Sequence, residues 1–131
     1  MNDQIADWTT SKSFRPRMTL VVEGELSAVR DAVVARFVEA GYNVADQRPD
    51  GVRLTYVDWF GVLGGTLVRT AVAVEGHPDG ATSVLLVSVE GGGESRQGRK
   101  RGQRALNAAV ADLERDGLAV TMTPWSPPDG E

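Results

Sequence analysis

The sequence has no cysteine and only one histidine, His77. Without cysteine the chain can form no disulfide, no thiolate nucleophile and no cysteine-ligated zinc or iron–sulfur site. We expect His77, beside Pro78, in a hairpin turn, where a solvated histidine is commoner than a catalytic base. The acids are scattered and no nucleophile motif is present, so we expect no metal and no cofactor. The sequence argues against an enzyme without excluding one.

Long apolar runs are also missing. The apolar stretches, such as 71–74 and 84–87, have the length of strands, whereas about 20 residues are needed to cross a bilayer. The N-terminus carries an early acid and has no apolar core, so it does not resemble a secretory signal. Together with the absence of cysteine, these features favour a cytoplasmic protein without membrane contact.

What is present is a globular composition: 131 residues, of which 41% are hydrophobic and 24% charged. This length suits one domain with a core of its own. We expect an N-terminal tail at 1–17, with the apolar anchors Ile5, Trp8 and Phe14, a single domain at 18–123, and a Pro/Gly-rich tail at 124–131.

Hydrophobic periodicity predicts two helices and five strands. The first helix runs from Ser27, a suitable N-cap, to Ala40, and the second from the glycine run at 91–93 to about Asp116; Gly41 and Gly117 end them. The expected strands are Met18–Glu23, Tyr42–Gln47, Val52–Asp58, Thr66–Glu75 and Thr82–Glu90, with Leu118–Thr123 as a candidate sixth. A Pro-Asp-Gly turn and a turn at 76–80 join the two hairpins.

These elements predict a two-layer α+β domain in which two helices cover one face of an antiparallel sheet, in the order β-α-β-β-β-β-α. From Met18 to Asp116 this order resembles the TATA-binding-protein-like topology and the helix-grip domains of the Bet v1 and START type. In helix-grip domains the C-terminal helix leans on a curved sheet and often encloses a ligand cavity. The order lacks the two short helices and two strands of the usual helix-grip pattern, and no signature residue matches.

A basic run opens the second predicted helix. Between 96 and 104 lie five cations and no acid, although the chain as a whole has a net charge of −4. Such a run near free helix amides suits an anion, and the candidate anion-binding residues are Arg96, Arg99, Lys100 and Arg101. The plainer interpretation is a solvated loop, with the helix beginning near Gly102. The overall acidity argues against a dedicated nucleic-acid binder.

The segment from 56 to 65 joins two strands yet is strongly apolar, whereas loops usually run over the wet surface. It could line a pocket mouth, bind a partner or cap the core. Two glycines on the second helix, four residues apart, leave room for the sheet or for a ligand. The candidate ligand-binding residues are Tyr56, Asp58, Trp59, Phe60, Gly98 and Gly102.

The second hairpin is apolar on both faces, although a sheet covered on one side only is normally polar on the other. A second subunit, the tryptophan-bearing tails or strong curvature could cover the free face, and a homodimer is the simplest explanation. The leading hypothesis is a non-catalytic binding module for a small apolar or amphipathic, optionally anionic, ligand between the sheet and the second helix. The alternatives are a protein-interaction or self-assembly domain and weak nucleic-acid binding through the basic run.

Overall fold

The computed structural model describes residues 8, 15–60, 66–92 and 96–126, without the side chains of 58–60 and 66–68. Its elements are β1 (Arg17–Val22), α1 (Leu26–Glu39), β2 (Asn43–Arg48), β3 (Gly51–Phe60), β4 (Thr66–Asp79), β5 (Thr82–Gly91), α2 (Arg96–Arg115) and β6 (Val120–Met122). The strands form one antiparallel sheet in the order β2-β3-β4-β5-β1-β6. The predicted α+β fold is therefore confirmed, and the candidate sixth strand is present.

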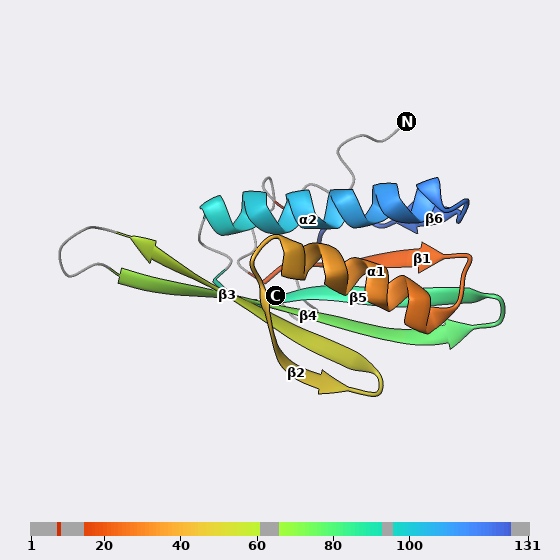
Figure 1. Ribbon diagram of the computed structural model, residues 1–131, viewed down its shortest axis with the longest axis horizontal. Coiled ribbons are helices and arrows are strands. Elements are labelled where there is room, and N and C mark those ends of the chain that lie inside the picture. Colours follow the sequence, from red (N-terminus) through yellow and green to blue (C-terminus); the bar gives the residue numbers. More distant parts are fainter. Residues whose placement is uncertain (1–7, 9–14, 61–65, 93–95, 127–131) are drawn as a thin grey trace.

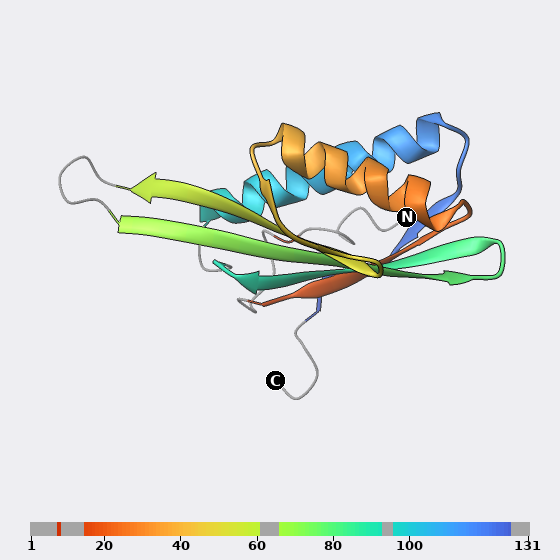
Figure 2. The same cartoon turned by 60° about the horizontal axis from the view of Figure 1, so that its bottom comes forward.

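Both helices lie on the same side of the sheet, and α2 runs alongside α1 (Figures 1 and 2). Strand alternation explains this layering, because every second residue of β1 and β5 is buried, beginning at Met18 and at Ser83. The core between the sheet and the helices contains fully buried side chains from both layers, such as Leu20 of β1, Leu85 of β5 and Leu106 of α2. Neither helix in the described part of the chain has the length and apolar character that a bilayer crossing requires.

Glycine ends both helices as the sequence predicts. Gly41 has φ = +108°, its N–H bonds to the carbonyl of Val38, and the N–H of Tyr42 bonds to the carbonyl of Phe37. This is the Schellman pattern, and the rings of Phe37 and Tyr42 pack edge to face at 5.0 Å. The start of α1 was predicted wrongly: Glu25 is the N-cap, and the Ser27 hydroxyl donates to the Glu25 carboxylate instead of capping the helix.

The second hairpin turns later than predicted. His77 and Pro78 belong to β4, where they pair with Val84 and Ser83, and the chain reverses at 80–81 with Gly80 at φ = +63°. A proline is tolerated there because β3 reaches only as far as the partner of Glu75, so the last residues of β4 form a sheet edge. His77 is exposed on a strand and not in a turn.

Candidate functional site

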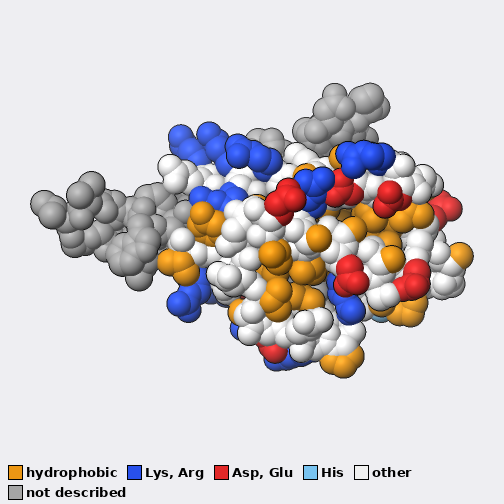
Figure 3. All heavy atoms as spheres, in the orientation of Figure 1, with side chains coloured by type: hydrophobic (Ala, Val, Ile, Leu, Met, Phe, Trp, Pro, Cys, Tyr) orange, Lys and Arg blue, Asp and Glu red, His pale blue; other side chains and the backbone are white. Residues whose placement is uncertain are grey.

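A groove with a volume of about 570 Å³ lies between α1 and the N-terminal half of α2. Small-molecule sites commonly fall in the range of about 300–1,000 Å³. Four cations line the groove, namely Arg36, Lys100, Arg101 and Arg104, together with a single acid, Glu39. Figure 3 shows basic side chains gathered over the N-terminal part of α2, whereas most acidic side chains on this face lie over the middle and the opposite end of the molecule.

The basic run is helical and not a solvated loop, because α2 begins at Arg96. Helical geometry then divides the run. Lys100, Arg101 and Arg104 line the groove, whereas Arg96 and Arg99 do not. Of the four predicted anion-binding residues, the structure therefore brings two into the groove. It adds Arg104, which belongs to the basic run but was not among the four candidates, and Arg36, which the sequence analysis did not single out.

Arg101 is held in place by Tyr56. Its guanidinium carbon lies 3.6 Å from the centroid of the Tyr56 ring, a cation–π contact. Tyr56 in turn packs against Tyr42 at 5.4 Å between ring centroids, and a side chain at Gly41 would come within 2.6 Å of the Tyr56 ring. The glycine that ends α1 thus also makes room for the ring beneath Arg101. This chain of contacts fixes one wall of the groove to the sheet.

Arg36 joins the two helices. It donates to both carboxylate oxygens of Asp112 at 2.5 and 2.7 Å, and to Glu39 at 2.9 Å. A bidentate arginine–carboxylate pair is geometrically specific, so it fixes how α1 lies against α2. The hydrogen bonds from Arg36 lower the pKa of Asp112 from 3.8 to about 2.

The described residues contain no group of three or more acidic or histidine side chains suited to a metal ion.

The Arg36–Asp112 pair makes stability depend on pH. Because the pKa of Asp112 is lower in the folded protein, its contribution is fully present above about pH 4 and is lost as the pH falls toward 2. We expect Asp112→Asn to lower the urea midpoint at pH 7 and to make little difference near pH 2. Urea unfolding of both proteins across this range measures the effect. A gap between the midpoints that stays constant with pH would contradict the assignment.

The space between the sheet and α2, where the sequence analysis places a ligand, is occupied by Trp8. This side chain is 1% exposed, and a methyl group added at Gly102 would overlap its ring. The backbone N–H of Trp8 and the indole N–H of Trp125 both donate to Oε1 of Gln103, at 2.5 and 2.9 Å. Gly102 therefore accommodates a residue of the chain itself, and Gly98 is likewise buried.

The other predicted ligand-binding residues lie at the far end of β3. Asp58, Trp59 and Phe60 pair with Val68, Leu67 and Thr66 along the β3–β4 ladder, which projects beyond the helices (Figure 1). Their side chains, and the apolar loop 61–65, lie outside the described residues. Tyr56 is the one member of this group whose side chain is described, and it contacts Arg101 at the wall of the groove.

Sequence reasoning missed Gln103 and Arg36 as structural partners. It considered the tail that carries Trp125 as a cover for the free face of the sheet, whereas Trp125 bonds to Gln103 of α2. A polar Gln103 within the buried stripe of an amphipathic helix was the available signal for the first, because a buried amide needs partners. The long-range pairing of Arg36 with Asp112 had no local signal, since the two residues are 76 positions apart.

Comparison with known proteins gives a distant likeness only. No family model matches the chain, and no curated protein matches its sequence. Among solved structures, the chain is similar to TTHA0849 from Thermus thermophilus, with 13% sequence identity and a TM-score of 0.37, over 77% of this chain and 94% of that one.

Proposed function

We propose that this protein is a non-catalytic binding module for a small amphipathic anion, held in the groove between α1 and α2. The observation that carries the proposal is the charge of the groove. No ion pair joins Lys100 or Arg104 to an acid in the described part of the chain, and both side chains are exposed. The one lining acid, Glu39, is already bonded to Arg36. The groove therefore presents uncompensated positive charge to a ligand.

The apolar part of the ligand is inferred from the rest of the lining. Ala40, the C-cap residue of α1, and Ala105 and Ala108 of α2 contribute methyl groups between the cations. Small-molecule sites combine polar groups that fix the orientation of a ligand with apolar contact area, and the groove offers both, with six charged or polar side chains and three alanines. A carboxylate, sulfonate or phosphate carrying a hydrocarbon portion would satisfy both features. The space between the sheet and α2 is not offered to the ligand, because Trp8 fills it.

Binding can be tested with 1-anilinonaphthalene-8-sulfonate, a fluorescent amphipathic anion. We expect the double variant Lys100→Ala/Arg104→Ala to weaken binding by about 100-fold, since two charge-assisted contacts are lost. Fluorescence titration measures the dissociation constant, and native mass spectrometry of freshly purified protein shows whether a natural ligand copurifies.

The matched control is Arg96→Ala/Arg99→Ala, which removes the same charge from the same helix outside the groove. This control should bind within about threefold of the unmodified protein, because neither side chain lines the groove and neither can contact the probe directly. Equal losses of affinity in both double variants would show that the probe responds only to the overall positive charge of α2. Unchanged affinity in both would show that the probe binds outside the groove. Either result would overturn the proposal.

A further inference from the structure

The side of the sheet that faces away from both helices, called the outer face, carries an uncharged band. It is formed by half-buried outward residues of the adjacent strands β1 and β5, namely Thr19, Val21, Val84, Leu86 and Ser88, and it ends at Arg17, which lies on the same face opposite Ser88. Register places Thr19 opposite Leu86 and Val21 opposite Val84, so the band is continuous. A one-sided antiparallel sheet normally turns polar residues to water, so this band is suited to a partner.

The two tryptophans of the tails, both described by the structure, do not lie on the outer face. Trp8 packs on Gly102 of α2, and Trp125 bonds to Gln103 of the same helix, with the two indole rings 5.4 Å apart. Both tryptophans therefore lie on the helix side of the sheet. Phe14, the other aromatic residue of the N-terminal tail, lies outside the described residues.

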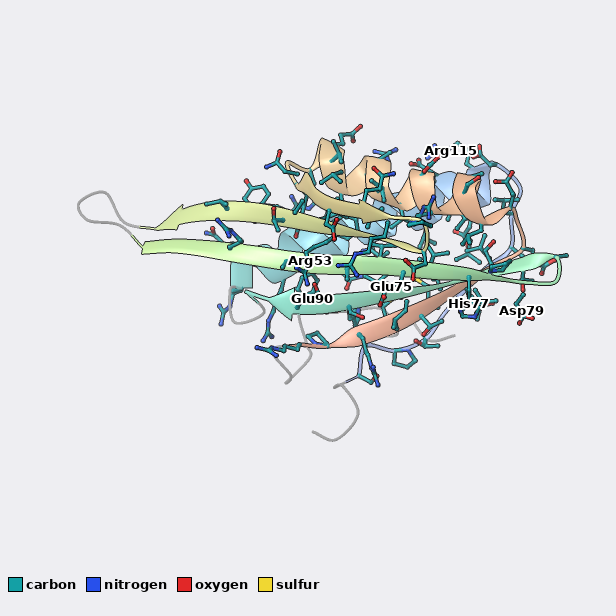
Figure 4. The ribbon with its side chains drawn as sticks, turned by 90° about the horizontal axis from the view of Figure 1, so that it is seen from below. Arg53, Glu75, His77, Asp79, Glu90 and Arg115 are labelled. Carbon is teal, nitrogen blue, oxygen red and sulfur yellow. The ribbon has the colours of Figure 1, made fainter. Side chains whose placement is uncertain are left out.

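Charges on the outer face are divided along β4. Arg69 lies near one end, whereas Glu75 and Asp79 lie toward the other, and all three are exposed. Ten residues separate Arg69 from Asp79, or about 33 Å along the strand. Figure 4 shows Glu75, His77 and Asp79 following one another toward the β4–β5 turn. Between these ends, Arg53 and Glu90 form an ion pair at 2.7 Å and neutralise one another.

We infer that the outer face binds the outer face of a second copy of this chain. The division of charge selects one orientation of the pair. A two-fold axis that lies between the copies, parallel to the sheet and perpendicular to the strands, sets Arg69 of each copy near Asp79 of the other. An axis along the strands would set like charges together. The uncharged band then forms the centre of an isologous interface, and the charges form its rim.

The centre of the interface is tested with Leu86→Arg and Thr19→Arg, each of which puts a charge into the band. We expect the unmodified protein to sediment as a dimer, and each variant to raise the dimer dissociation constant by about 30-fold or more. Val38→Arg is the control, because Val38 is 46% exposed on α1, on the other side of the sheet. Circular dichroism verifies that all variants are folded. A monomeric unmodified protein, or a dimer indifferent to both band variants, would refute the inference.

The orientation is tested with charge reversals. Arg69→Asp and Asp79→Arg should each weaken the dimer by about 10-fold, since two rim pairs per dimer turn repulsive. Both changes in one chain should restore the affinity, because the pairs are re-formed with exchanged signs. A double variant weaker than either single variant would refute the antiparallel arrangement. Titration of the groove with the sulfonate probe should be unchanged throughout, so this result is separable from the proposed function.

Discussion

Gly102→Ala is expected to destabilise the protein by about 2–4 kcal/mol, although alanine is the better helix former. On helix propensity alone, replacing this glycine by alanine would raise the free energy of unfolding by about 1 kcal/mol. The added methyl group, however, overlaps the ring of Trp8, which is packed directly on the glycine. Expelling a buried tryptophan costs about 3–5 kcal/mol, so the sign of the net effect is the reverse of the helix propensity. Urea unfolding followed by circular dichroism gives the change in the free energy of unfolding.

Tryptophan fluorescence gives a second measure of the same event. Trp8 is 1% exposed in the folded protein, so its release should shift the emission to longer wavelength under native conditions. Gly91→Ala is the control, since nothing lies within 4 Å of the position its methyl group would take. A stabilised Gly102→Ala protein with unshifted emission would show that Trp8 does not pack on α2.

The fold was predictable because its signals are local. Alternation in β1 and β5, the 3.6-residue period of α1 and the glycines that end both helices each act within a few residues. The errors have local causes too. Ser27 is a good N-cap in isolation, but it lies inside the first turn of a helix whose N-cap is Glu25. The proline at 78 suggested a turn. It is tolerated in a strand because β4 extends beyond β3 at this position, so the proline lies on a sheet edge.

The groove was predictable only in part, because it is made by two elements that meet far apart in the sequence. The cations of α2 were visible as a run, but their division into groove-lining and outward residues depends on where the helix begins. Arg36 has no signal in its own neighbourhood, since its partner Asp112 is on the other helix. The position of Trp8 illustrates the same point, because glycine spacing on α2 shows that a space exists without showing what fills it.

The other large effect is expected from Gln103→Leu, which keeps the size of the side chain and removes its acceptor. Oε1 of Gln103 accepts from the Trp8 backbone N–H and from the Trp125 indole N–H, while Nε2 donates to Asn107 at 2.9 Å. Two donors converging on one oxygen fix the orientation of the amide. Without it the buried N–H of Trp8 has no acceptor, and we expect a loss of about 2–3 kcal/mol in the free energy of unfolding.

A double-mutant cycle with Trp8→Ala separates the hydrogen bond from the packing. If Gln103 acts by holding Trp8, the two losses should not add, and the coupling energy should exceed about 1 kcal/mol. Asn107→Ala is the control: it removes the exposed partner of the same amide and should cost much less. Fully additive losses would mean that Gln103 stabilises α2 independently of the tail. A coupled result would show that residues at both ends of the chain complete the core beneath α2, because Trp8 and Trp125 depend on one side chain of that helix.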